Sequence, residues 1–396
     1  MALVMLSSLQ IKNFRSLQNV EIPKLGLINL IVGNNNSGKS SLIESLLIFA
    51  NNADEDVLNT LAYQHGEPTL TDRDEDDFSA PFQPFESFFT NRRFPTEDGV
   101  KIIIGELDNL NILTIEHAFE TELIIKLEDE DGNTLRRLKR DIIPKSEIEE
   151  KLEDPDFNLQ VNSILKVENK SYINRISLEP DRRRTSTLSR SFDAKLNIPH
   201  SYIPTSFLDT DELALDWDKL VLTPYQDYII EALQIIEPNV ENISFIKSIN
   251  YRRSKYRNSQ RTPIVKLKNH SQPFPLSSMG DGILRILQLV LKLHSARGGI
   301  LLIDEFDNGL HHSVQTKVWE LVFSLAKNLK IQVFATTHSS DCVKAFSKVS
   351  KDKEDIEGIL VQIGKSTRKS NFGDVIANVL DENQLATFIK SDFEVR

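Results

Sequence analysis

The segment from Gly33 to Ser40, which reads GNNNSGKS, is the first place in this sequence where residue types and spacing point to a chemistry. It fits the pattern G-x-x-x-x-G-K-[ST], in which the glycines let the backbone curl so that successive N–H groups point at phosphate oxygens. A helix beginning there would turn its positive end toward the same phosphates. Lys39 is expected to reach the β- and γ-phosphates, and Ser40 to hold Mg²⁺. The predicted nucleotide-binding residues of this loop are Gly33, Asn34, Asn35, Asn36, Ser37, Gly38, Lys39, Ser40 and Ser41.

The residues on either side of this loop help to decide between a phosphate-binding loop and an ordinary Asn/Gly-rich turn. LINLIV at 27–32 is an apolar run of the strand type, and SSLIESLLIFA at 40–50 places its apolar residues on one helical stripe. Strand, loop and helix in this order are the context in which the pattern is meaningful. We therefore predict a nucleotide site, with Lys39 among its catalytic residues.

A second chemical signal is the pair of acids Asp304 and Glu305, which follows the apolar run ILLI at 300–303. A buried strand that ends in two acids delivers carboxylates to the carboxyl edge of a parallel sheet, where ligands bind in open α/β folds. Asp304 is the predicted partner of Ser40 in holding Mg²⁺, and Glu305 is the predicted base that orients or deprotonates the attacking water. Two surface charges at a strand end are the alternative, and the phosphate-binding loop argues against it.

Two further segments carry weaker signals. His338 closes the run IQVFATT at 331–337, where a histidine can contact a γ-phosphate and sense its loss, although a lone histidine is more often structural. Ser278 and Gly280 lie in LSSMGDG at 276–282, which opens an amphipathic helix and can form a second phosphate-binding feature. Taken alone, that segment favours an ordinary N-cap with a glycine turn. The order of the four motifs favours a functional role for both segments.

Together the four motifs resemble those of ABC-type ATPases, and within that class the branch of RecF-like and OLD-family ATPases. The resemblance rests on NFRS at 13–16, the Asn-rich loop, Ser278–Gly282 in place of the LSGGQ signature, and DEFDNGLHH at 304–312 followed by FATTHS. It covers about residues 1–50 and 200–396, and the closing FEVR also resembles the end of stand-alone members. It implies an α/β ATPase head with a mainly parallel core sheet, an antiparallel β lobe and a helical lobe or insertion.

The resemblance further implies a homodimer or higher homo-oligomer, in which ATP lies between the loop of one head and Ser278–Gly282 of the other. Arg15, Ser278 and Gly280 would then contact nucleotide, residues 307–311 would lie across the interface, and one head alone would hydrolyse ATP poorly. The signature departs from the usual one at Met279 and Asp281. The glutamine that joins phosphate to the helical lobe is either Gln64 or Gln83.

Composition limits the classes of protein to which this chain can belong. Apolar residues make up 40% and charged residues 27%, as in globular proteins, and no apolar run is long enough to cross a bilayer, so no membrane role is expected. The single cysteine, Cys342, excludes an internal disulfide framework and fits a reducing compartment. We expect a cytoplasmic protein without a signal peptide, with Cys342 in its core.

The net charge of −11 argues against general adhesion to nucleic acid, but two basic segments leave local contact with DNA open. One comprises Arg182, Arg183, Arg184 and Arg190, and the other Arg252, Arg253, Lys255, Arg257 and Arg261 with Tyr251 and Tyr256. Most such runs are solvated loops. The Asp209-Thr210-Asp211 triplet resembles a Toprim DxD only superficially, and because 58 residues follow His338 we expect no Toprim nuclease domain.

The chain is expected to divide into an ATPase core at 1–50 and 199–396 and an insertion at 51–198. Within the insertion we expect little regular structure at 51–100, then strands in KIIIGEL, NILTIEHAF, TELIIKLED and SYINRISL, a DGN hairpin turn at 131–133, a helical stretch at 138–157 and a loop at 182–198. In the core we expect strands at 8–14, 19–23, 27–32, 298–305 and 331–340, and helices at 40–50, 225–236, 280–296 and 311–329. The sequence has no sustained heptads, which argues against a long coiled-coil arm.

Two functions from different classes fit these observations. The first is a stand-alone ATPase of a prokaryotic antiviral system that controls a separately encoded effector, such as a nuclease, because the head resembles OLD proteins without an effector domain. The second is a RecF-like, ATP-dependent DNA clamp in repair, which would use the basic segments. The acidic total charge and the large β-rich insertion favour the first. A transporter ATPase fits the signature and the insertion poorly.

Overall fold

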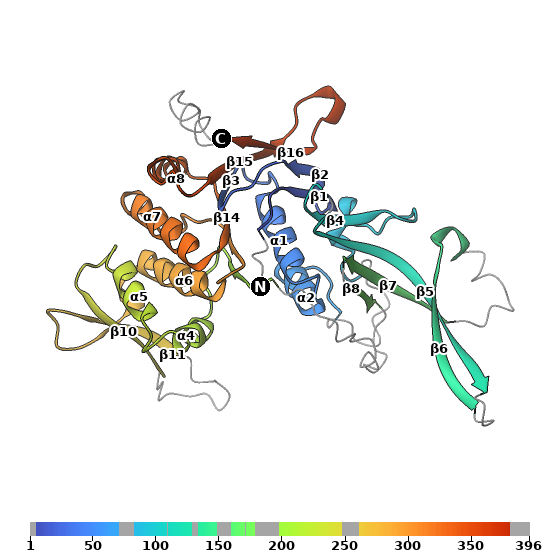
Figure 1. The fold of residues 1–396 in the computed structure, drawn as a ribbon, viewed down its shortest axis with the longest axis horizontal. Coiled ribbons are helices and arrows are strands. Elements are labelled where there is room, and N and C mark those ends of the chain that lie inside the picture. The colour runs from blue at the N-terminus through green and yellow to red at the C-terminus, as the bar shows by residue number, and fades with distance from the viewer. Residues whose placement is uncertain are drawn as a thin grey trace.

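The computed structural model describes residues 5–70, 83–108, 110–128, 134–148, 160–170, 172–178, 198–247 and 261–380. A six-stranded sheet, ordered β16-β15-β3-β14-β13-β9, lies at its centre (Figure 1). Its strands are β3 (Ile28–Val32), β9 (His200–Ile203), β13 (Ile300–Ile303), β14 (Gln332–Thr337), β15 (Gly358–Lys365) and β16 (Val375–Leu380). Neighbours from β15 to β9 pair in parallel, and β16 pairs antiparallel with β15. The expected mainly parallel core sheet is confirmed.

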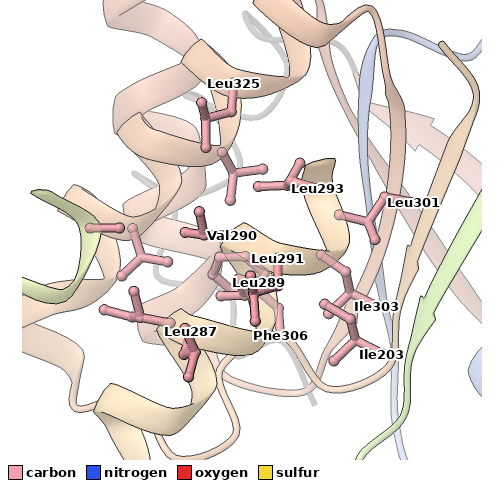
Figure 2. Packing of buried hydrophobic residues seen from close by; sticks show 14 of the residues in the cluster. Ile203, Leu287, Leu289, Val290, Leu291, Leu293, Leu301, Ile303, Phe306 and Leu325 are labelled. Atoms are coloured by element: carbon pink, nitrogen blue, oxygen red, sulfur yellow. The ribbon is translucent and has the colours of Figure 1, made fainter. Parts of the chain in front are cut away.

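Helices cover both faces of this sheet, which a parallel sheet requires. One face carries α1 (Lys39–Ala50), and the other carries α6 (Asp281–Ser295), α7 (His312–Leu329) and α8 (Ser340–Asp352) (Figure 1). Because side chains alternate along a strand, Leu30 joins the core beneath α6–α8 and Ile31 joins the core beneath α1. Figure 2 shows the first of these cores, where Leu287 and Leu291 of α6 lie among other buried residues beside the sheet. The helices expected at 40–50, 280–296 and 311–329 are confirmed as α1, α6 and α7.

A second, antiparallel sheet forms the expected β lobe. Its path runs β2-β1-β4-β5-β7-β8, and β6 pairs with β5. The strands are β1 (Leu9–Phe14), β2 (Leu17–Ile22), β4 (Lys101–Gly105), β5 (Ile112–Glu128), β6 (Thr134–Ile143), β7 (Gln160–Asn169) and β8 (Tyr172–Ser177). The far ends of β5 and β6 extend away from the rest of the molecule (Figure 1). The pairing of β1 with β4 joins the N-terminal strands to strands of the segment 51–198, whose boundary at residue 50 stays a prediction.

Three expectations for the segment 51–198 need correction. Residues 51–100 hold a regular helix, α2 (Glu55–Gln64), which Asp54 caps by accepting the N–H of Asp56 at 3.1 Å, and the 3-10 helices η1 (Glu86–Phe88) and η2 (Thr90–Arg92). NILTIEHAF and TELIIKLED form one strand, β5, rather than two. Residues 138–143, expected to be helical, belong to β6, because pairing with β5 outweighs their helical spacing.

The remaining expectations for this segment fall partly or wholly on residues that the structure does not describe. The short 3-10 helix η3 (Lys145–Glu147) follows β6, and positions 149–157 of the expected helical stretch lie outside the described residues. The DGN turn at 131–133 also lies outside them, as does the loop expected at 182–198 up to residue 197. The strand β7 was not among the expected runs.

A helical lobe packs below α6 in Figure 1 and contains α4, α5 and a small sheet. Its elements are α4 (Thr210–Asp218), α5 (Tyr225–Leu233), β10 (Val240–Lys247), β11 (Arg261–Leu267) and β12 (Phe274–Pro275), and η5 (Leu276–Met279) leads into α6. The helix expected at 225–236 is α5, which ends at Leu233. Leu213 of α4 shares a buried cluster with Leu301 of β13, so the lobe and the main sheet have one continuous core.

Two details complete the architecture. The 3-10 helix η6 (Lys369–Asn371) lies between β15 and β16. In the part of the chain that the structure describes, no helix combines the length and the apolar character needed to span a membrane.

Candidate functional site

The loop from Gly33 to Ser40 joins the carboxyl end of β3 to the first turn of α1. Gly33 packs so closely that a Cβ atom there would lie 2.1 Å from the carbonyl oxygen of Ile363 in β15. Asn36 (φ 59°) and Gly38 (φ 97°) adopt left-handed backbone conformations, which asparagine and glycine tolerate best. These turns place the first N–H groups of α1 beside the loop. Those groups have no carbonyl partner within the helix and remain available to a ligand.

Lys39 lies within this loop and is only 9% exposed. Its Nζ donates to the carbonyl oxygens of Gly33 at 2.7 Å and Asn34 at 2.9 Å. Burial lowers the pKa of Lys39, and the negative charges of Asp304 and Glu305 partly oppose this effect. A desolvated ammonium group held in place in this way would interact strongly with an anionic phosphate.

A pocket of about 430 Å³ opens beside the loop. One side is formed by Gly33–Ser37, and the other by Gln362–Lys365 of β15 with Ile376 and Asn378 of β16. Since β15 runs parallel to β3, its carboxyl end reaches the same edge of the sheet as the loop. The volume falls in the range of small-molecule sites.

The carboxylate of Asp304, at the end of β13, meets three hydroxyl groups. Ser40 Oγ lies 3.3 Å from Asp304 Oδ2, and Thr205 Oγ1 donates to the same oxygen at 3.2 Å. Thr336 Oγ1, from β14, donates to Asp304 Oδ1 at 2.6 Å. The two residues predicted to hold Mg²⁺, Ser40 and Asp304, therefore come together, and a hydroxyl and a carboxylate oxygen fit a hard cation of this kind.

Glu305 and His338 lie at the same edge of the sheet. His338 Nδ1 is 3.8 Å from Glu305 Oε1, and the two side chains are 54% and 35% exposed, respectively. Glu305 has a left-handed backbone (φ 49°), and its N–H donates to Thr336 Oγ1 at 2.8 Å. The predicted base and the predicted phosphate sensor are therefore neighbours and both reach solvent.

The segment Ser278–Gly282 lies apart from the pocket of its own chain. Of the described residues that line the pocket at Gly33–Ser37, none belongs to this segment. Ser278 is exposed and donates to the carbonyl of Pro275 at 2.7 Å, and Gly280 (φ 92°) is exposed as well. The structure thus brings Lys39, Ser40, Asp304, Glu305 and His338 to one sheet edge and leaves Ser278 and Gly280 facing solvent.

Arg15 makes its main side-chain contacts with the protein itself. Its Nη1 donates to Glu67 Oε1 at 2.9 Å, and Nε forms an ion pair with Glu44 Oε2 at 2.8 Å that is not aligned as a hydrogen bond. The guanidinium also lies 4.9 Å from the ring centroid of Phe88. Its predicted contact with nucleotide stays a prediction.

The other residues singled out in the sequence have separate places. Gln64, at the end of α2, lines a cleft of about 380 Å³ between α1 and β9, whereas Gln83 lies before η1, so the structure leaves the choice between them open. Asp209 caps α4 by accepting the N–H of Asp211 at 2.8 Å, a structural role. Cys342 is fully buried, and burial raises the pKa of its thiol to about 12.

The basic segments lie mostly outside the described residues, at 179–197 and 248–260. Arg261 is described, and both of its terminal nitrogens bind the carboxylate of Asp218. Contact of these segments with DNA stays a prediction.

Three residues that contact the site were not assigned a role from the sequence. Thr205 and Thr336 donate to the carboxylate of Asp304, and Arg285 donates to the carbonyl oxygens of Asp304 and Glu305. Thr336 stood within the motif that ends at His338, and its position on the strand beside Asp304 could have suggested a contact. Thr205 follows the four-residue strand β9, which is too short to stand out in the sequence. Arg285 is one of few charges on a mostly apolar helix, which was the available signal.

This chain is similar to a protein family and to two proteins of known sequence. The model of the AAA_21 family, described as "AAA domain, putative AbiEii toxin, Type IV TA system", matches residues 28–341. An "ATP/GTP phosphatase" of Helicobacter pylori is 23% identical over 370 residues, which cover 88% of this chain and 90% of that protein. The uncharacterized protein MJECL10 of Methanocaldococcus jannaschii is 44% identical over 45 residues, which cover 11% of this chain and 20% of that protein.

Solved structures of SMC head domains are also similar to this chain. An Smc head bound to the C-winged helix domain of ScpA is 11% identical with a TM-score of 0.46, covering 95% of this chain and 98% of that one. The SMC head domain from Thermotoga maritima is 12% identical with a TM-score of 0.39, covering 96% and 99%.

The chain belongs to the AAA_21 family. The family match and the similarity to an ATP/GTP phosphatase make it a P-loop ATPase.

Proposed function

We propose that this chain binds ATP at Gly33–Ser40 and hydrolyses it with Glu305 as the general base. The observation that carries the proposal is the convergence of Asp304 on Ser40, 3.3 Å apart, with Glu305 and His338 at the same sheet edge. The similarity to an ATP/GTP phosphatase supports nucleotide hydrolysis as the reaction.

The residues of the site divide the reaction among them. The loop N–H groups and Lys39 bind the phosphates. Glu305 takes a proton from a water whose oxygen bonds to the γ-phosphorus, while the bond from that phosphorus to the β–γ bridging oxygen breaks and its electrons leave with ADP. His338 contacts the γ-phosphate and registers its loss. Ser40 and Asp304 would hold Mg²⁺, which would supply positive charge beside the phosphate oxygens.

The complete site takes residues from two copies of the chain. Ser278 and Gly280 are exposed, and among the described residues they contribute nothing to the pocket of their own loop. We infer that they contact the nucleotide bound by a second copy, so that ATP closes a homodimer and its hydrolysis opens it. A switch of this kind is suited to controlling another protein.

Replacement of Glu305 tests the assignment of the base. Glu305→Gln should lower the turnover of MgATP by about 100-fold or more while ATP binding persists, because the amide cannot accept the proton. The substituted protein should also accumulate as an ATP-bound dimer in sedimentation or light scattering. Glu320→Gln, which changes an exposed acid on α7, is the matched control and should hydrolyse normally. A wild-type rate for Glu305→Gln would show that the base is another residue.

We further propose that the ATP-dependent dimer controls a separately encoded effector, such as a nuclease, in defence against viruses. The family description names a toxin of a type IV toxin–antitoxin system, which supports action together with a second component. The test is co-purification with the product of the neighbouring gene, together with protection of cells from phage that Lys39→Ala abolishes. A protein without a partner that protects nothing would exclude the role. Salt-sensitive, ATP-dependent DNA binding lost in Arg252→Glu/Arg253→Glu would favour the DNA clamp instead.

A further inference from the structure

Arg285 is a buried cation that contacts the backbone of Glu305, the proposed base. It lies on the first part of α6 and is 1% exposed. Its Nη2 donates to the carbonyl oxygens of Asp304 at 2.8 Å and Glu305 at 2.7 Å, and its Nη1 donates to the carbonyl of Pro204 at 3.0 Å. One guanidinium therefore holds the ends of β9 and β13 together at the catalytic edge.

The backbone at Glu305 needs such support because it is strained. A left-handed conformation (φ 49°) is costly for a residue with a Cβ atom, and persists only where the surroundings enforce it. Two hydrogen bonds do so here: the N–H of Glu305 donates to Thr336 Oγ1 at 2.8 Å, and its carbonyl accepts from Arg285. The conformation sets the direction in which the Glu305 carboxylate leaves the end of the strand.

Packing alone does not explain a buried arginine at position 285, because burying its charge costs free energy. Burial lowers the pKa of its guanidinium to about 10, against the opposing effect of Asp304, Asp307 and Glu305, so the group remains charged at neutral pH. Its Nε has no hydrogen-bond partner among the described residues. A buried charge with an unsatisfied donor usually stabilises a fold less than an apolar side chain of similar size, which points to a role in positioning.

The same helix begins at the signature segment. α6 starts at Asp281, directly after Ser278–Gly280, and a Cβ atom at Gly282 would lie 2.9 Å from the carbonyl oxygen of Gly309. The first turn of α6 is therefore in close contact with the segment 307–310 that follows Glu305. A displacement of Ser278–Gly280 by a bound nucleotide would reach Glu305 through this contact and through Arg285.

We propose that Arg285 is a positioning residue that holds Glu305 in its left-handed conformation and links the orientation of this base to the signature segment on the same helix. This inference rests on the proposed role of Glu305 in ATP hydrolysis. In the proposed dimer, α6 would connect Ser278–Gly280, which contact the nucleotide of the second copy, to Glu305, which acts on the nucleotide of its own loop.

Kinetics of Arg285→Lys test the proposal, because lysine keeps the charge and loses the two-branched contact. The variant should lower kcat by about 10- to 100-fold and change KM by less than about threefold, since a misdirected base affects the chemical step and not binding. Arg285→Gln, which removes the buried charge but keeps an amide donor, should behave in the same way. Arg261→Lys, in the helical lobe, is the matched control and should keep wild-type turnover. Binding of a fluorescent ATP analogue reports whether each variant is folded.

A double-substitution comparison separates positioning from a general structural effect. If Arg285 acts through the carboxylate of Glu305, Arg285→Lys should change the residual single-turnover rate of Glu305→Gln by less than about twofold. An equal loss of rate in both backgrounds, or a wild-type kcat for Arg285→Lys in the Glu305-containing protein, would overturn the inference. A wild-type rate for Glu305→Gln alone is a different result, because it contradicts the proposed base and is measured without changing Arg285.

Discussion

Lys39 is held by carbonyl groups of its own loop, and replacing its side chain should weaken nucleotide binding. Its ammonium group donates to the carbonyl oxygens of Gly33 and Asn34 and is largely withdrawn from water, so it would present a fixed, poorly solvated charge to bound phosphates. Lys39→Ala should weaken binding of a fluorescent ATP analogue by at least about 100-fold, the loss of a charge-assisted contact. Lys317→Ala, at an exposed position of α7, is the control. Equal affinities for Lys39→Ala and the wild type would exclude this role.

At the scale of residues, the sequence predicted those site members that stand in contiguous motifs. Lys39, Ser40, Asp304, Glu305 and His338 each follow a recognisable strand, and parallel strands bring such ends to one edge. Other members act across the sheet. Thr336 and Arg285 matter because a hydroxyl and a guanidinium reach Asp304 and Glu305 from neighbouring elements. Spacing along the chain carries no information on contacts of that kind.

At the scale of elements, β5 carries a buried titratable group whose protonation should affect stability. His117 is 6% exposed, stacks on Phe94 with ring centroids 3.9 Å apart, and lies 3.0 Å from Ser163 Oγ. Burial, with a smaller effect from Lys145, lowers the pKa of His117 to about 4. The unfolded chain, with an ordinary histidine pKa of about 6.5, therefore binds a proton between pH 6.5 and 4 that the folded chain does not.

The free energy of unfolding should accordingly fall as the pH drops through this window. The contribution of His117 between pH 8 and pH 5 is about 2 kcal/mol. It is measured as the difference in unfolding free energy by urea titration at the two pH values. His117→Gln should show a pH dependence smaller by that amount, whereas His270→Gln, at an exposed site, should retain the wild-type dependence. Identical profiles for His117→Gln and the wild type would contradict the burial of a neutral histidine.

The elements themselves were predicted unevenly, for physical reasons. The apolar strands β3, β13 and β14 and the amphipathic helices α6 and α7 have long, clear periodicities. The stretch 138–143 has a spacing that also fits a helix, and only its pairing with β5 decides for a strand. β9 has four residues, and its place at the edge of the sheet depends on β13 far along the chain. Long-range pairing of this kind leaves little trace in local sequence.

At the scale of the whole molecule, each chain supplies two different halves of the composite site that we propose. The sheet edge with Lys39 and Glu305 and the exposed segment with Ser278 belong to one chain, and Ser278 does not line the pocket beside Gly33–Ser37. The continuous core of Leu213 and Leu301 joins the helical lobe to the main sheet, so one chain presents both surfaces from a single packed body. Two copies related by a twofold axis would then form two equivalent sites.

Complementation between two inactive variants tests most directly whether each nucleotide site takes residues from two chains. Lys39→Ala disables the loop and Ser278→Arg obstructs the signature, so each variant alone should hydrolyse almost no ATP. A dimer with one chain of each kind, purified through two different tags, has one site in which both halves are intact. We expect it to hydrolyse ATP at about half the wild-type rate per dimer. A mixed dimer as inactive as its parents, or full activity of Ser278→Arg alone, would contradict the composite site.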